Sequence, residues 1–345
     1  MGLLPEEGKS PMNALPLEKQ TRVIAALTEG CSVRAVERLT DVHRETILNL
    51  GVRVGDGCRR LLDGMMRKLQ VGVVELDEQW SFVGCKQKNV RPHDEHGRER
   101  GDSWLFIALD ATSKAVLSYV VGKRTAENTL ALAEDLHARL VNRPQITADG
   151  WLPYVNAVPL AFDRKVDFAQ LQKVYQSTPG NDAAHRYSPG SIRGIEKQVV
   201  CGTPDESKIS TSYVERFNLS TRMHLRRFTR LTNGFSKKLA NHRAAIALHM
   251  AYYNLVRMHE TIRCTPAMAL GVTDHPWTVA ELIEAALSAP EPTPLLPTQP
   301  PLPFGMSAGR AKGTWGGALA DRPRPTKTGG NPGPKRFRVI KGGRV

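Results

Sequence analysis

The feature that most constrains the fold is an acid inside a strand-forming run. Residues 71–83 are rich in Val, Leu, Trp and Phe, which favours a β-strand, and Asp77 stands in the middle of the run. A carboxylate in a buried strand is costly unless it is paired or coordinated. Because side chains alternate along a strand, Glu75 shares a face with Asp77, whereas Glu78 lies on the other. The run therefore predicts a sheet strand whose Asp77 has a charged or metallic partner.

The elements after this run predict an α/β protein. Further strands are expected over 103–109, 115–121 and 146–148, and Thr125 is the expected N-cap of a helix that runs to about Leu140. Three antiparallel strands, a helix and another strand begin a ribonuclease-H-like mixed sheet flanked by helices, although other α/β folds open in the same way.

The later elements are predicted mainly as helices. A strand is expected only over 196–201, and Thr265 followed by Pro266 indicates the start of a short last helix. The other helical stretches are 151–157, 168–175, 210–231 and 237–258.

Three short helices are predicted ahead of the sheet, over 17–28, 32–39 and 43–54. A tight turn before the third is typical of a helix-turn-helix domain, although an ordinary three-helix unit gives the same pattern. For a helix-turn-helix domain, the residues expected to face the major groove of DNA are His43, Arg44, Glu45, Thr46 and Asn49.

Two more acids stand where a metal site could use them. Asp149 follows the strand 146–148, at a strand exit where ligand sites of open α/β sheets cluster. Glu215 is the only acid between Ser207 and His259 and lies beside Arg216 on a basic helix. Asp110, the main rival as a second ligand, is better explained by the hairpin turn that it begins.

Asp77, Asp149 and Glu215 are therefore the candidate catalytic and metal-binding residues. Phosphodiester chemistry requires such a set, because two divalent ions roughly 4 Å apart must be held by shared oxygens. Mg²⁺ prefers carboxylate oxygens and keeps several waters, so that few protein ligands suffice.

The charge distribution points to a polyanionic partner. The chain of 345 residues has a net charge of +14, of which +9 lies between Arg216 and His259 and +8 lies in 290–345. The remaining residues together carry a slightly negative net charge. No uncharged apolar run of membrane-spanning length occurs, and five scattered cysteines give no zinc or disulfide pattern. The residues expected to bind phosphates are Arg216, Arg222, Arg226, Arg227, Arg230, Lys237 and Lys238.

Several strings of this sequence together resemble the insertion-sequence-one family of DDE transposases. They occur in the family's order within 71–270. They are Asp77-Glu-Gln-Trp-Ser-Phe-Val-Gly84, Trp104-Leu-Phe-Ile-Ala-Leu-Asp110, Ala148-Asp-Gly-Trp151, Tyr213-Val-Glu-Arg-Phe-Asn-Leu-Ser-Thr-Arg222, His224-Leu-Arg-Arg227 and Phe235-Ser-Lys237.

This resemblance implies a ribonuclease-H-like core that cleaves and transfers DNA strands with two Mg²⁺ ions, for which Mn²⁺ can substitute. It carries the catalytic triad onto Asp77, Asp149 and Glu215. The implied partner is double-stranded DNA, both element ends and target, in the cytoplasm of a bacterium at its nucleoid. Because two ends must be brought together, a homodimer or larger assembly is expected. A membrane is not expected as a partner.

Three alternatives stay open at this point. The chain could be a helix-turn-helix regulator or a decayed transposase that only binds DNA, or a nuclease that cuts without joining.

Trp80 and Trp151, close to the acids, could be core aromatics or stacking partners of bases.

The predicted organisation has four parts. Residues 1–16 form a flexible leader, 17–70 the helix-turn-helix domain, and 71–275 the catalytic core. An insertion near 159–207 is expected because this stretch is longer than in compact family members. Residues 276–345 are expected to form a short helix and then a disordered Pro/Gly-rich basic tail, either merely solvated or in contact with phosphates.

Overall fold

The computed structural model describes residues 15–91, 93, 97, 99–175, 192–229 and 232–291. The predicted leader lies almost entirely outside these residues, as do the basic tail beyond 291 and part of the insertion expected near 159–207. Arg230 lies outside them as well.

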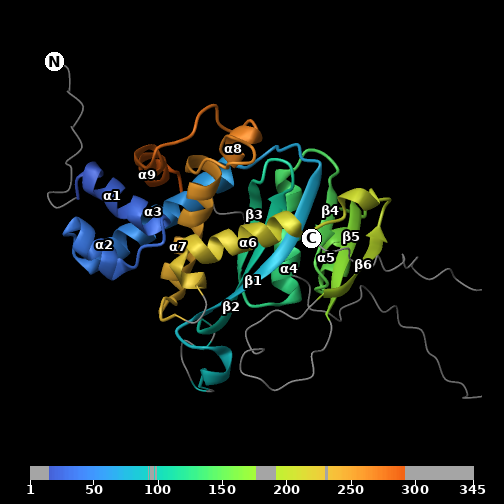
Figure 1. Ribbon diagram of the computed structural model, residues 1–345, viewed down its shortest axis with the longest axis horizontal. Coiled ribbons are helices and arrows are strands. Elements are labelled where there is room, and N and C mark those ends of the chain that lie inside the picture. The colour runs from blue at the N-terminus through green and yellow to red at the C-terminus, as the bar shows by residue number, and fades with distance from the viewer. Residues whose placement is uncertain are drawn as a thin grey trace, which may run out of the picture.

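Six strands form one mixed sheet in the order β3-β2-β1-β4-β5-β6 (Figure 1). β1 is a central strand that pairs with β2 antiparallel and with β4 parallel; β4 and β5 are parallel, whereas β2 with β3 and β5 with β6 are antiparallel. The strands are β1 (Val73–Val83), β2 (Gly101–Asp110), β3 (Val116–Gly122), β4 (Gln145–Ala148), β5 (Asp167–Tyr175) and β6 (Ile192–Cys201).

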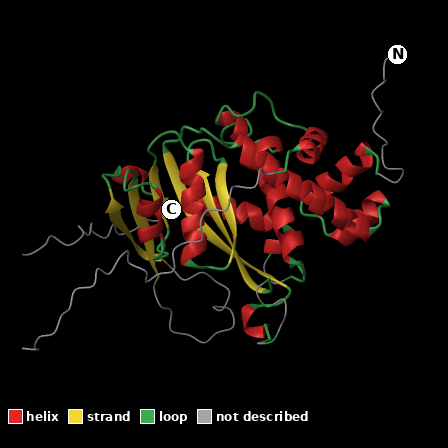
Figure 2. Ribbon diagram, turned by 180° about the vertical axis from the view of Figure 1, so that it is seen from behind, coloured by secondary structure: helices red, strands yellow, loops and turns green. Residues whose placement is uncertain are grey.

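Helices cover both faces of this sheet. α4 (Ala126–Arg139) and α5 (Tyr154–Ala161) lie on one face, and α6 (Ser212–His224) crosses the other (Figures 1 and 2). Thr125 caps α4 as predicted, since its hydroxyl accepts a hydrogen bond from the backbone N–H of Asn128. A mixed sheet flanked by helices is thus confirmed.

The remaining helices pack together beside the sheet. α3 reaches from the two N-terminal helices to α7 and α9, and one hydrophobic core joins this bundle to the sheet. They are α1 (Leu17–Thr28), α2 (Val33–Thr40), α3 (Arg44–Met65), α7 (Leu239–Ala251) with its π-helical end (Tyr252–Val256), α8 (Pro266–Ala269) and α9 (Val279–Ser288). Within the described part of the chain, none of the helices is both long and apolar enough to cross a bilayer.

Two predictions of helices were wrong. Residues 168–175 form strand β5, because backbone pairing with β4 on one side and β6 on the other outweighs the helical spacing of their apolar side chains. The long helix predicted over 210–231 ends at His224 and is followed by a 3₁₀ turn (Arg226–Phe228), which buries Phe228.

Helix α3 is longer than predicted because two of its glycines are packing positions. A Cβ at Gly55 would lie 2.2 Å from the backbone oxygen of Ala244 in α7. A Cβ at Gly57 would lie 2.1 Å from the backbone oxygen of Ala286 in α9. The absence of a side chain at these positions therefore lets three helices approach closely.

Alanine substitutions in α3 should distinguish the effect of helix packing on stability from the effect of helix propensity. Gly55→Ala and Gly57→Ala should each lower the free energy of unfolding by about 1–3 kcal/mol, because the added methyl group overlaps a neighbouring helix. Gly64→Ala is the control in the same helix, since nothing lies within 4 Å of its Cβ position, and should raise stability by about 0.5–1 kcal/mol. Urea denaturation measures all three, and equal stability of the three variants would contradict this packing.

Candidate active site

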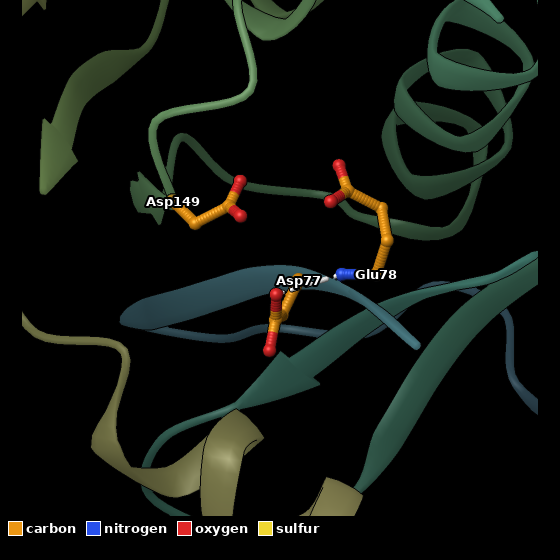
Figure 3. A group of neighbouring side chains, drawn as sticks. All are labelled: Asp77, Glu78 and Asp149. Carbon is orange, nitrogen blue, oxygen red and sulfur yellow. Dashed lines mark hydrogen bonds between the residues drawn. The ribbon is translucent and has the colours of Figure 1, made fainter. Parts of the chain in front are cut away.

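Three carboxylates meet where β1 continues past the end of β4. One oxygen from each of Asp77, Glu78 and Asp149 lies within 4.8 Å of the others (Figure 3). β1 pairs with β4 up to Leu76 and Ala148, and β4 ends there. Between this pair and Val83, which forms a bridge with Ser236, no described strand borders β1 on that side, so side chains from both of its faces can turn toward Asp149. Figure 3 shows the carboxyl groups of Asp149 and Glu78 on one side of the β1 ribbon and that of Asp77 on the other.

Asp77 is held by two hydrogen bonds. Its Oδ1 accepts from the backbone N–H of Glu78 at 2.8 Å, and its Oδ2 accepts from the side-chain amide of Asn218 in α6 at 2.7 Å. Burial, and then the charge of Asp149, raise the pKa of Asp77 to about 7. The sequence predicts a charged or metallic partner for this buried acid; the side-chain partner in the described structure is the neutral amide of Asn218, on the helix that also carries Glu215.

Glu78 is the acid that the sequence did not single out, because strand alternation placed it on the opposite face from Asp77. Only 1% of its side chain is exposed, and its Oε2 accepts a hydrogen bond from Arg124 at 3.1 Å. Burial, and then the charge of Asp149, raise the pKa of Glu78 to about 8 in spite of Arg124. The only signal in the sequence is its place next to Asp77.

Arg124 is fixed between two indole rings. Its guanidinium carbon lies 4.7 Å from the ring centroid of Trp104 and 4.0 Å from that of Trp151. The Trp151 indole N–H donates to the hydroxyl of Thr129 at 3.1 Å. Trp151 therefore stacks on a cation of the site, and a stacking role toward DNA bases stays a prediction.

Asp149 lies in a loop that the neighbouring strand holds in place. Its Oδ1 accepts from the backbone N–H of Trp151 at 3.1 Å. The side-chain amide of Gln170 in β5 donates to the backbone oxygens of both residues, at 2.9 Å each. Burial raises the pKa of Asp149, against the bond from Trp151 and the charge of Arg124.

Glu215 lies near this group but outside the three acids whose oxygens come together. Its carboxylate, 41% exposed, pairs with the ammonium group of Lys173 in β5 and accepts from the Thr211 hydroxyl at 2.7 Å. Its negative charge is close enough to raise the pKa of both Asp77 and Asp149. Lys173 was missed because its segment was predicted as a helix.

The position of Glu215 depends on a buried acid two residues before Asp77. Glu75 Oε2 accepts the backbone N–H groups of Tyr213 and Val214, each at 2.8 Å, in the first turn of α6. Gln79 adds a bond to the backbone oxygen of Asn218 at 3.0 Å. A carboxylate at a helix N-terminus satisfies free N–H groups and complements the helix dipole.

The residues predicted to bind DNA fall into three groups. Exposed on α3 are Arg44, Thr46 and Asn49, and exposed in and after α6 are Arg216, Arg226, Lys237 and Lys238. Arg222 and Arg227 are half-buried, and burial lowers the pKa of Arg227. Asp110 belongs to a turn, as predicted, because its Oδ2 accepts the backbone N–H and hydroxyl of Ser113 at 2.7 and 2.6 Å.

A cavity of about 570 Å³ lies away from these acids, between α3, α4, α7 and the edge strand β3. Charged side chains of both signs line it, among them Arg59, Asp135 and Arg243. None of the acids described above contributes to it.

Comparison with known proteins gives matches to transposases. Residues 70–170, which include Asp77, Glu78 and Asp149 and stop before Glu215, match a family described as IS1 transposase. The insertion element iso-IS1n protein InsB of Shigella dysenteriae is 28% identical over 186 residues, which are 52% of this chain and 98% of that protein. The insertion element IS1 4 protein InsB of Escherichia coli (strain K12) is 27% identical over 51% of this chain and 72% of that protein.

One solved structure, a piggyBac transposase synaptic complex with hairpin DNA, matches 78% of this chain and 58% of that chain at 10% identity. Its TM-score of 0.27 is too low to support a statement about the fold. The family match and the InsB relatives confirm the resemblance drawn from the sequence: residues 70–170 of this chain are similar to the IS1 transposase family.

Proposed function

We propose that the chain is a DDE transposase that cleaves and transfers DNA strands, with Asp77, Asp149 and Glu215 as its triad. The observation that carries the proposal is the meeting of acids from distant segments, Asp77 and Asp149, at one strand end, with Glu215 in electrostatic reach of both. Mutually repelling carboxylates are kept together where they share a cation or a proton.

The residues fit a divalent metal ion. Three carboxylate oxygens lie within 4.8 Å of one another, and Glu78 Oε1 is buried without a hydrogen-bond partner in the described structure. Such oxygens are the ligands that Mg²⁺ and Mn²⁺ prefer. Asp77, Asp149 and Glu215 would hold two ions, whose charge would activate the attacking oxygen and stabilise the leaving one.

The order of the elements supports a ribonuclease-H-like core. The first three strands are antiparallel, β4 and β5 follow parallel to β1, and α6 brings Glu215 to the face on which Asp77 bonds Asn218. β6 extends this order by one antiparallel strand and lies within the stretch 159–207 where an insertion is expected.

The protein's own groups would position the reactants. Asn218 and the backbone N–H of Glu78 orient Asp77, and Gln170 holds the loop of Asp149. Exposed Arg216 follows Glu215 on α6 and would contact the phosphate next to the cleaved bond. Water would attack that bond, and the freed 3′ hydroxyl would then attack target DNA in line.

The N-terminal helices would recognise the element ends. Ser32 caps α2 by accepting from the backbone N–H of Ala35, and Glu37 accepts the backbone N–H of Arg44 at the start of α3. This arrangement leaves Arg44, Thr46 and Asn49 exposed on the first turns of α3, as a helix-turn-helix reader requires. Because two ends must react together, we expect a homodimer or larger assembly on DNA.

Substitution of the triad tests the catalytic role. Asp77→Asn, Asp149→Asn and Glu215→Gln should each lower Mg²⁺-dependent nicking of DNA with the element's ends by more than about a hundredfold, because each removes a metal-binding charge. Binding of the same DNA should persist. Glu134→Gln, an exposed acid on α4, is the control.

The same assay separates the alternatives. Full nicking by all three variants would show that these acids do not catalyse cleavage, and would favour the alternative of a protein that only binds DNA. Nicking by the wild type without strand-transfer products on a supercoiled target would favour the alternative of a nuclease that cuts without joining.

Two substitutions separate reading of bases from binding of phosphates. Asn49→Ala should weaken binding to the repeat by about 1–3 kcal/mol and leave binding to unrelated DNA unchanged, because it removes a contact with base edges. Lys238→Ala should weaken both equally and reduce the slope of log affinity against log salt by about 1. Fluorescence anisotropy over a salt series measures both, and equal effects of the two variants would argue against a reading role for α3.

Stability should depend on pH through Asp77. Its pKa is raised from 3.8 to about 7, so the folded protein binds more protons than the unfolded chain between these values. Without divalent ions, stability therefore falls as pH rises through about 7. In Asp77→Asn this contribution is absent, and Mn²⁺ should restore wild-type stability above pH 7. Urea denaturation from pH 5 to 9, with EDTA or Mn²⁺, measures the difference, and parallel curves for wild type and variant would contradict the raised pKa.

A further inference from the structure

Glu78 has an oxygen that nothing in the described structure satisfies. Its side chain is 1% exposed, and Oε1 has no hydrogen-bond partner. A buried carboxylate oxygen without a donor or a cation is strongly disfavoured. This oxygen belongs to the residue whose carboxylate completes the group with Asp77 and Asp149.

Arg124 fixes the direction in which Glu78 points. Its guanidinium binds Oε2 at 3.1 Å and is itself held between the rings of Trp104 and Trp151. A flat cation packed over two aromatic rings has little freedom to follow a moving carboxylate. Glu78 therefore keeps one oxygen on Arg124 and has the other free for a ligand.

Glu215 is engaged elsewhere in the same structure. Its carboxylate contacts the ammonium group of Lys173 and the hydroxyl of Thr211. A cation that approaches the free protein therefore meets three available acids in Asp77, Glu78 and Asp149, whereas binding to Glu215 requires separation from Lys173.

We propose that Glu78 is a fourth metal-binding carboxylate, which forms the first divalent cation site together with Asp77 and Asp149, and that Arg124 is its positioning residue. Glu215 then joins after it leaves Lys173, when DNA is bound. This inference rests on the proposed function in taking a divalent cation as the ligand, and it adds a residue and an order of binding.

A second role for Glu78 sets the control. The Tyr154 hydroxyl is buried close to Glu78, and both its contact with that carboxylate and the charge of the carboxylate are among the causes that raise the pKa of Tyr154. If Glu78 affected cation binding only through its contact with this hydroxyl, Tyr154→Phe would change cation binding as much as Glu78→Gln does.

The experiment measures Mn²⁺ binding to the full chain without DNA, from the electron paramagnetic resonance signal of free Mn²⁺. Glu78→Gln should weaken binding by about tenfold or more, as should Asp77→Asn. Arg124→Lys keeps the charge but loses the stacked, planar group, and should also weaken binding. Tyr154→Phe and the surface control Glu134→Gln should bind as wild type does. Thermal unfolding verifies that each variant is folded.

Two outcomes would overturn the inference: undiminished Mn²⁺ affinity in folded Glu78→Gln and Arg124→Lys, or the absence of Mn²⁺ binding to the wild type. The nicking assay on the same samples keeps the two proposals apart. If Asp77→Asn fails to nick while Glu78→Gln binds Mn²⁺ normally, only the role of Glu78 is wrong. If Asp77→Asn nicks fully, the proposed catalytic triad is wrong whatever Glu78 binds.

Discussion

Alternate side chains of β1 attach α6 to the sheet, and the geometry of the site depends on this contact. Glu75 accepts two backbone N–H groups of the first turn of α6, Asp77 accepts from Asn218, and Gln79 donates to the backbone of Asn218. Successive residues on one strand face are about 7 Å apart, which lets three of them reach along one helix. Glu215 is carried on that helix, so its distance from Asp77 is set by hydrogen bonds and not by the long segment between them.

The same contact concentrates negative charge, which cations on other elements offset. Arg124 binds Glu78 from the end of β3, and Lys173 binds Glu215 from β5. Burial still raises the pKa of Asp77, Glu78 and Asp149. These partners hold the acids close together, which is the arrangement that the proposed metal site needs. Such preorganisation costs stability in the absence of the ion.

Much of the fold follows from local sequence. The strands β1 to β4 and the capped helix α4 lie where periodicity and the cap at Thr125 placed them. The prediction was wrong for β5, whose apolar residues have helical spacing, because its conformation is decided by β4 and β6 on either side. α3 was predicted too short, because Gly55 and Gly57 resemble a helix end until α7 and α9 are seen against them.

The sequence by itself determined the candidate acids: one within a buried strand, a second at a strand exit and a third alone on a basic helix, with strings that resemble a transposase family. Tertiary structure decided which groups meet. Glu78, which alternation correctly places on the face opposite Asp77, still reaches Asp149 because β4 ends one pair before Asp77. Arg124 and Lys173 became visible only in the fold, because no local pattern records which side chains distant strands bring together.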